Sequence, residues 1–134
     1  MLIHNSKIRV RYGETDKMGV VYYGTYALYY EVGRTDLMRK YGIAYSELEK
    51  LGIQLPVHSM DCEYIKSAIY DDEIIIKTTV VEMPLAKIKF YYELYNGENQ
   101  LINKATTTLF FFNSDTKKPI RAPHFFIDKI KEFF

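Results

Sequence analysis

The chain has 134 residues, of which 48% are hydrophobic and 26% charged, a composition typical of one domain around one core. We therefore predict a single domain over residues 1–134. Its 18 basic and 17 acidic side chains leave a formal net charge of +1, which gives no support for a nucleic-acid or membrane-surface partner. No apolar run approaches the roughly 20 residues that a membrane-spanning helix needs.

Two features bear on the compartment. The N-terminal stretch MLIHNSKIRV lacks the apolar segment and the small-residue cleavage site of a secretory signal. The lone Cys62 cannot form an internal disulfide, which suits a reducing environment. Together they predict a cytoplasmic protein.

The first part of the chain predicts a strand, a loop and a long helix. Residues 7–12 alternate charged and apolar side chains, which is typical of a strand with Ile8, Val10 and Tyr12 on one face. A loop over residues 13–19 follows. The spacing of apolar residues then predicts a helix over residues 26–41, with Ala27, Tyr30, Leu37 and Tyr41 toward the core.

The ends and the middle of this helix carry specific signals. Thr25 is a candidate N-cap, and Gly42 is a good C-terminal stop. Gly33 costs roughly 1 kcal/mol relative to Ala within a helix. We expect that Gly33 lets a neighbouring backbone approach closely, and that Glu31 and Arg34 form a side-chain pair.

The remaining chain is mostly strand. Ser46 and Glu49 resemble a capping box at the start of a short helix that ends at Gly52. Strands are predicted over 54–64, with Pro56 indicating a sheet edge, and over 73–82, 87–95 and 101–112, and a short terminal helix over 127–134. One long helix and a five-stranded antiparallel sheet make an α+β fold in which the sheet can wrap the helix.

The stretch around Asp16 carries the chemistry. Asp16 lies on a loop just before the long helix, and Gly19 follows it after Lys17 and Met18. A helix start offers unpaired N–H groups that can hold a developing oxyanion, while the carboxylate attacks or takes a proton. The alternative is that Asp16 only bonds its own loop backbone, as Asp often does in turns.

Other reactive residue types are not grouped in the sequence. His4, His58 and His124 show no metal-ligand spacing, so we predict no metal site. No Gly-rich nucleotide motif and no GxSxG motif occurs, and we predict no cofactor. Cys62 lies in a strand pattern and is expected to be buried rather than nucleophilic.

The motif YGETDKMGVVYY over residues 12–23 resembles the hotdog-fold acyl-CoA thioesterases of the 4-hydroxybenzoyl-CoA thioesterase family. The resemblance covers almost the whole chain. Further matching positions are Tyr26, Tyr30, Glu31, Arg34, Tyr70–Asp72, Thr106–Phe112, Lys118, Pro119 and Pro123. It implies a hotdog fold, with a long central helix wrapped by a five-stranded antiparallel sheet.

The resemblance also implies roles for site residues. Asp16 matches the catalytic Asp of the family, and Tyr23 matches the residue whose backbone N–H contacts the thioester carbonyl. Many relatives carry His at this second position; a backbone role survives the change, whereas a role for a His side chain does not. Gly19, Tyr22 and Tyr26 are candidates for substrate binding, although Tyr22 and Tyr26 could equally be packing residues.

The predicted function is hydrolysis of an acyl-CoA thioester, with Asp16 as nucleophile or general base. The alternatives are a thioesterase for acyl-carrier-protein substrates and a non-catalytic hotdog protein that binds acyl chains. Similar proteins pair two sheet edges and place two active sites at the interface, so the resemblance implies a homodimer or homotetramer.

Overall fold

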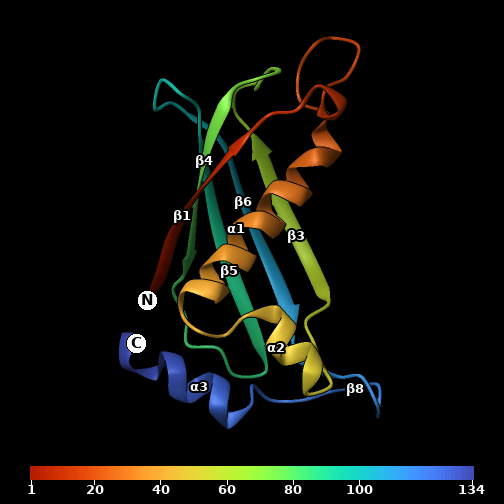
Figure 1. Cartoon of the computed structure of the whole chain (residues 1–134), viewed down its shortest axis with the longest axis vertical. Helices are drawn as coiled ribbons and strands as arrows, with labels where there is room; N and C mark the ends of the chain where they lie inside the picture. The colour runs from red at the N-terminus through yellow and green to blue at the C-terminus, as the bar shows by residue number, and fades with distance from the viewer.

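The computed structural model describes all 134 residues and shows one long helix packed against a five-stranded antiparallel sheet (Figure 1). The helix α1 spans Tyr26–Lys40. The strand order is β1-β4-β5-β6-β3, with bounds Leu2–Arg9 for β1, Val57–Tyr64 for β3, Glu73–Val80 for β4, Lys87–Tyr95 for β5 and Leu101–Phe110 for β6. The predicted α+β fold is confirmed, and β4, β5 and β6 are the predicted antiparallel neighbours.

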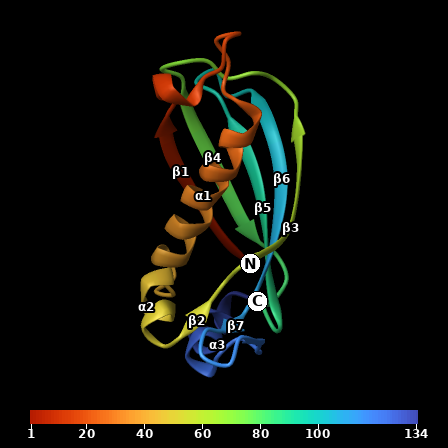
Figure 2. The ribbon, with the colours of Figure 1, turned by 90° about the vertical axis from the view of Figure 1, so that its right-hand side faces the viewer.

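Several shorter elements gather at one end of the molecule (Figure 2). A second sheet of three strands, in the order β2-β7-β8, was not predicted. Each of its strands has two residues, which is too short to show an alternating pattern. The elements at this end are α2 (Tyr45–Lys50), β2 (Ile53–Gln54), β7 (Phe112–Asn113), β8 (Lys118–Pro119), α3 (His124–Ile130) and the 3₁₀ turn η3 (Lys131–Phe133). Two further 3₁₀ turns, η1 (Tyr12–Glu14) and η2 (Tyr23–Thr25), precede α1.

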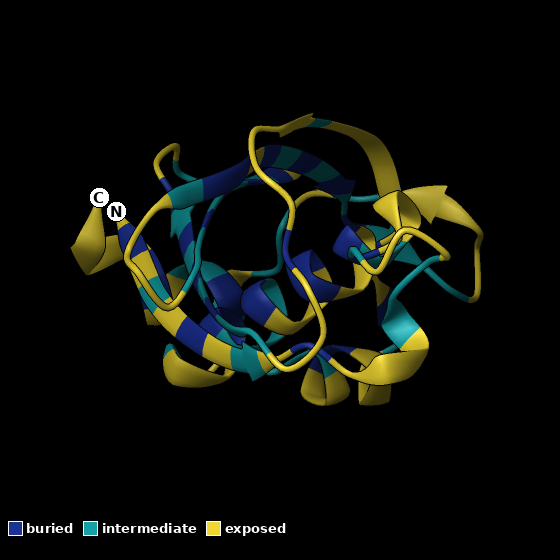
Figure 3. Cartoon of the chain, turned by 90° about the horizontal axis from the view of Figure 1, so that it is seen from above, coloured by how far each residue is buried: buried dark blue, intermediate teal, exposed yellow.

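The core lies between α1 and the inner face of the curved sheet (Figure 3). Strands β4 and β5 alternate buried and part-exposed side chains, as expected for strands with one covered face. The helix buries Tyr26, Tyr29, Tyr30, Gly33, Leu37 and Met38. Ala27, predicted to be buried, is exposed, because the covered stripe runs through Tyr26 and Tyr29 on either side of it.

Gly33 sits where α1 comes nearest to β4. A Cβ atom at this position would lie 2.4 Å from Thr78 Oγ1 and 2.8 Å from Ile76 Cγ2. The predicted close approach is therefore present, but the neighbours are side chains of β4 rather than its backbone.

The two predicted N-caps have different outcomes: Thr25 holds the N-cap position of α1 as predicted, whereas the prediction of Ser46 as the N-cap of α2 is wrong. Thr25 makes no side-chain cap bond, because it belongs to η2, which leads directly into α1. Ser46 lies inside α2, and Ala44 occupies the N-cap position without a side-chain bond. The predicted pair of Glu31 and Arg34 does not form an ion pair, since no oxygen of Glu31 lies within 4.0 Å of an Arg34 nitrogen.

Strand ends also differ from the prediction. β1 begins at Leu2 and ends at Arg9, because its pairing with β4 runs from Leu2 opposite Val80 to Arg9 opposite Glu73. Tyr12 therefore falls outside the strand, in η1, and is exposed. The strand predicted over 54–64 is divided around Pro56 into β2 and β3, and β3 is an edge strand as predicted.

Candidate active site

The loop that carries Asp16 is a tight turn with two antiparallel arms. Thr15 and Val21 form a β-bridge between the arms. The Asp16 N–H donates to the Val20 carbonyl at 2.8 Å, and the Gly19 N–H donates to the Asp16 carbonyl at 3.0 Å. Gly19 has a φ of 81°, a left-handed conformation that side chains disfavour, so this turn requires glycine.

The Asp16 carboxylate has one bond within the loop. Its Oδ1 accepts from the Met18 N–H at 2.8 Å. Asp16 therefore does bond its own loop backbone, as the alternative prediction held, but through one oxygen. No basic side chain lies within 4.0 Å of the carboxylate, and Oδ2 has no donor in the chain. The residue is half-buried, which leaves one carboxylate oxygen free to act on a ligand.

Asp16 lines a pocket of about 350 Å³ between the loop, the start of α1 and the end of β3. Tyr23 and Tyr26 line the same pocket, so the structure brings together three of the five predicted site residues. The remaining lining residues are Met18, Val20, Val21, Tyr64, Ile65, Lys66 and Ser67. Most of these side chains are apolar, and Asp16 and Lys66 are the charged ones.

The two other predicted residues lie outside this pocket. Gly19 borders a neighbouring hollow on the surface, which it shares with Asp16. Tyr22 folds over Gly24, where a Cβ would lie 2.8 Å from the Tyr22 ring, and its ring centroid is 4.7 Å from that of Tyr23. Nothing in this arrangement brings the Tyr22 ring to the pocket of Asp16.

The backbone N–H of Tyr23 is unpaired, whereas its carbonyl accepts a hydrogen bond. Tyr23 is the first residue of η2, and its N–H donates to no acceptor in the chain. Its carbonyl accepts from the Tyr64 hydroxyl at 3.2 Å. Tyr64 packs edge-on against Tyr26 at 5.5 Å between ring centroids, so β3 fixes the turn that begins α1.

Tyr64 was not predicted as a site residue. It is 41 positions from Tyr23 in the chain, and only the pairing of β3 with β6 brings it to the pocket. Interaction with the Cys62 side chain, followed by burial, raises the pKa of Tyr64 to about 12, so its hydroxyl stays protonated at neutral pH and can donate. Cys62 itself is only half-buried, less than predicted.

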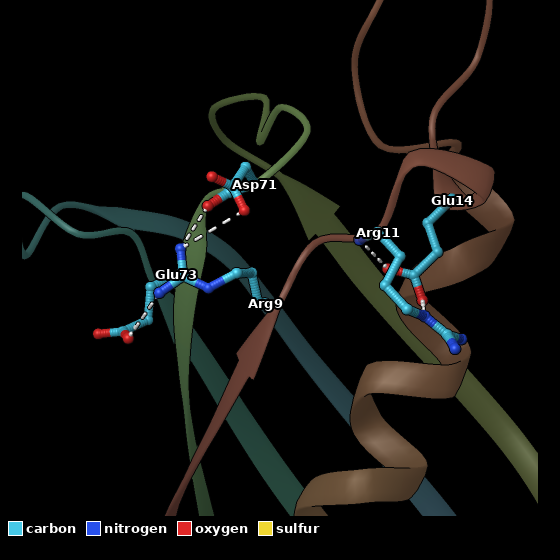
Figure 4. Close-up of polar contacts among 5 residues, drawn as sticks. All are labelled: Arg9, Arg11, Glu14, Asp71 and Glu73. Carbon is cyan, nitrogen blue, oxygen red and sulfur yellow. Dashed lines mark hydrogen bonds and ion pairs between the residues drawn. The ribbon is translucent and has the colours of Figure 1, made fainter.

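Glu14 forms the most connected polar group near the loop (Figure 4). Its Oε1 accepts from the Arg11 N–H at 2.9 Å and from the Tyr29 hydroxyl at 2.9 Å, and its Oε2 accepts from Arg11 Nε at 3.2 Å. Burial, the largest influence, raises the pKa of Glu14, but these hydrogen bonds outweigh it and the pKa is lowered overall. Burial also raises the pKa of Tyr29, helped by Glu14.

A second polar group fastens the end of β1 (Figure 4). Arg9 donates to the Asp71 carbonyl at 2.7 Å and to Glu73 at 3.3 Å. The Val10 N–H donates to the Asp72 carbonyl at 2.9 Å, and the Asp71 N–H donates to the Val10 carbonyl at 3.0 Å. These bonds fix the point at which the chain leaves the sheet and enters the Asp16 loop.

Other parts of the structure give weaker support for a functional site than the Asp16 pocket does. A hollow of about 440 Å³ lies on the outer face of the sheet, over β3 to β6, and no residue of a helix lines it. Groups of three or more His, Cys, Asp or Glu residues able to hold a metal do not occur. No helix has the length and apolar character needed to cross a membrane.

Comparisons with known protein families and with individual proteins agree on the family of this chain. The pattern of the thioesterase-like superfamily matches residues 10–132. The chain is 34% identical over 128 residues to a putative acyl-CoA thioesterase, YneP, of Bacillus subtilis, with 96% of this chain and 93% of that protein covered. These matches confirm the resemblance predicted from the motif around Asp16.

Solved structures agree with the fold. A DHNA-CoA thioesterase from Staphylococcus aureus superposes with a TM-score of 0.92 at 37% identity, covering 99% of this chain and 89% of that one. A 4-hydroxybenzoyl-CoA thioesterase superposes with a TM-score of 0.86 at 20% identity, covering 96% of this chain and 99% of that one, and at this identity the likeness concerns the fold alone.

Proposed function

The chain belongs to the thioesterase-like superfamily, and on that premise we propose that it hydrolyses acyl-CoA thioesters to a free acid and CoA. The observation that carries the proposal is the shared pocket of Asp16 and Tyr23. A free carboxylate oxygen and an unpaired backbone N–H at a helix start are the two groups that thioester hydrolysis needs. The names of the relatives support the same substrate class.

The reaction follows from these two groups. The thioester carbonyl accepts from the Tyr23 N–H, and the positive end of α1 stabilises the oxygen as negative charge develops. Asp16 either attacks the carbonyl carbon, giving a mixed anhydride that water then cleaves, or takes a proton from the attacking water. In both routes the C–S bond breaks, and the electron pair leaves with the CoA thiolate.

A thioester requires little further assistance. The thiolate is a good leaving group, with a pKa near that of Cys, so no separate acid is needed to protonate it. One carboxylate and one N–H group therefore suffice without a triad. The CoA nucleotide lies on the surface in this arrangement, and only the acyl end enters the pocket.

The lining of the pocket bears on the acyl group. Its side chains are mostly aromatic or aliphatic, which favours acyl groups with uncharged tails. We expect lower kcat/KM for succinyl-CoA and malonyl-CoA than for uncharged acyl-CoAs. Equal or higher kcat/KM for the two dicarboxylyl substrates would contradict this part of the proposal.

The exposed edge of β3 supports a dimer. β3 pairs only with β6, so its other edge carries unpaired backbone groups, and Val57, Met60 and Tyr64 each expose about half of their surface. We propose that β3 pairs with β3 of a second copy, next to the pocket that Tyr64 lines. Sedimentation at micromolar protein is expected to give at least twice 15.8 kDa; a species of 15.8 kDa alone would exclude it.

Release of free thiol tests the activity. The wild-type protein is mixed with acetyl-, hexanoyl-, palmitoyl- and 1,4-dihydroxy-2-naphthoyl-CoA, and with the hexanoyl ester of acyl-carrier protein. We expect turnover with at least one CoA ester and higher kcat/KM than for the carrier-protein ester. Higher kcat/KM for the carrier-protein ester would favour the acyl-carrier-protein function, and binding without thiol release would favour the non-catalytic one.

A further inference from the structure

We propose that Glu14 is a positioning residue that holds Asp16 and the Tyr23 N–H in a fixed relation to each other. The inference rests on the proposed function and adds to it a residue outside the pocket. Glu14 is not among the residues that line the pocket. Its contacts instead join three segments that must keep their places for the reaction to occur.

The first contacts join the two arms of the loop. Glu14 stands two residues before Asp16, and its carbonyl accepts from the Tyr22 N–H at 2.9 Å. Tyr22 directly precedes Tyr23, so this bond ties the arm that holds the carboxylate to the arm that holds the oxyanion donor. A shift of Glu14 therefore moves the two reactive groups relative to each other.

The second contact joins the loop to the helix. The Glu14 carboxylate accepts from the hydroxyl of Tyr29, which is one turn into α1 and almost fully buried. The Tyr29 ring also packs edge-on against Tyr26, at 5.7 Å between centroids, and Tyr26 lines the pocket. The loop is thus anchored to a rigid part of the core through a single carboxylate.

The third contact closes the base of the loop. The backbone N–H and Nε of Arg11 both donate to Glu14, and together with Tyr29 they give the carboxylate three donors. The Glu14 side chain is 13% exposed, whereas that of Arg11 is 80% exposed. An exposed ion pair alone is weakly held, so the constraint comes mainly from the two bonds of 2.9 Å, one from the Arg11 backbone N–H and one from the buried Tyr29.

Kinetics of Glu14→Ala test this role. We expect kcat to fall by roughly 10- to 100-fold, since a displacement of a reacting group by about 1 Å can cost 10²-fold, with KM changed less than about 3-fold. Glu14→Gln keeps an oxygen that accepts from Tyr29 and should retain more of kcat than Glu14→Ala. Unchanged kcat in folded Glu14→Ala overturns the proposal.

A second variant keeps the test decisive if Glu14→Ala does not fold. Tyr29→Phe keeps the buried ring and removes only the hydroxyl that Glu14 accepts from. It should lower kcat in the same direction. The matched control is Tyr91→Phe, which removes a hydroxyl that donates to Glu82 at 2.7 Å on the outer face of the sheet, and it should leave kcat unchanged.

A double variant with Asp16→Asn shows whether Glu14→Ala lowers kcat by displacing Asp16 or by a separate effect on the protein. If Glu14 acts through Asp16, adding Glu14→Ala to Asp16→Asn should lower the residual kcat by a smaller factor than Glu14→Ala lowers kcat of the wild type, because residues acting as a unit are not additive. Equal losses in both backgrounds overturn the role of Glu14. Full activity of Asp16→Asn instead overturns the catalytic role of Asp16, and no thiol release by the wild type overturns the proposed function; either result removes the basis for the role of Glu14.

Discussion

The two ends of α1 are held by different forces. At its C-terminal end Leu37 is fully buried, and Ile43, which follows α1, and Leu48 of α2 belong to the same core. At its N-terminal end, at the top of Figure 1, Tyr23 is 65% exposed and the turn is fixed by directional bonds. Tyr26 and Tyr29 in the first turn of α1 are buried as well, so the contrast is between the packed helix, which supplies stability, and the turn before it, whose hydrogen bonds keep polar groups available for a ligand.

The largest expected effect is on the packed end. Leu37→Ala removes a fully buried side chain and should lower the free energy of unfolding by about 2–5 kcal/mol. Because Leu37 is far from the Asp16 pocket, kcat/KM per folded molecule should stay within about 2-fold of the wild type. Denaturant unfolding and kinetics measure the two quantities, and a loss of kcat/KM in fully folded protein would break the comparison.

A smaller effect is expected at the other end from Tyr64→Phe. The change removes the hydrogen bond to the Tyr23 carbonyl and keeps the ring against Tyr26. We expect kcat/KM to fall by about 3- to 10-fold, equivalent to one ordinary hydrogen bond of about 1 kcal/mol, with little change in Tm. Tyr95→Phe, which loses a bond to Glu93 on the outer face, is the control and should match the wild type.

The pH dependence of stability tests the bonds of Glu14. Its pKa is lowered on folding, so the ionised group stabilises the fold above its unfolded pKa of 4.5, and that stabilisation is lost as the pH falls through the folded pKa. At pH 7, Glu14→Gln should be less stable than the wild type by roughly 1 kcal/mol. Unfolding measured at pH 7 and pH 3 should show this gap narrowing in acid; a constant gap would show that the charge of Glu14 is not involved.

The smallest effect is expected from Tyr23→Phe. The proposed contact is the backbone N–H, which every residue except proline retains. We expect kcat/KM within about 3-fold of the wild type and an unchanged Tm, because the side chain is largely exposed. Loss of all turnover in a stable protein would show that the hydroxyl takes part in the reaction.

The sequence predicted those features that are local in the chain. Asp16, Tyr23 and Tyr26 lie within one short stretch, and the structure places all three on one pocket. Tyr64 and the bond between Glu14 and Tyr29 could not be predicted in this way, because they depend on how β3 and α1 pack in three dimensions.

The errors in the fold have similar causes. Helical spacing placed Ala27 on the buried face of α1, but the packing of α1 against β1 and β4 covers the neighbouring stripe that contains Tyr29. The small sheet of β2, β7 and β8 arises from pairings between distant residues, such as Ile53 with Asn113. Two-residue strands of this kind have no periodicity that a sequence can reveal.

The central claim is that Asp16 carries the chemistry on a part-exposed loop where its own side chain contributes little to stability. The most direct test is kcat/KM and Tm of Asp16→Asn beside the wild type. We predict that kcat/KM falls by at least ~10²-fold, the lower end of what a positioned acid or base contributes, while Tm is nearly unchanged. A folded Asp16→Asn protein with near-normal turnover would contradict the claim.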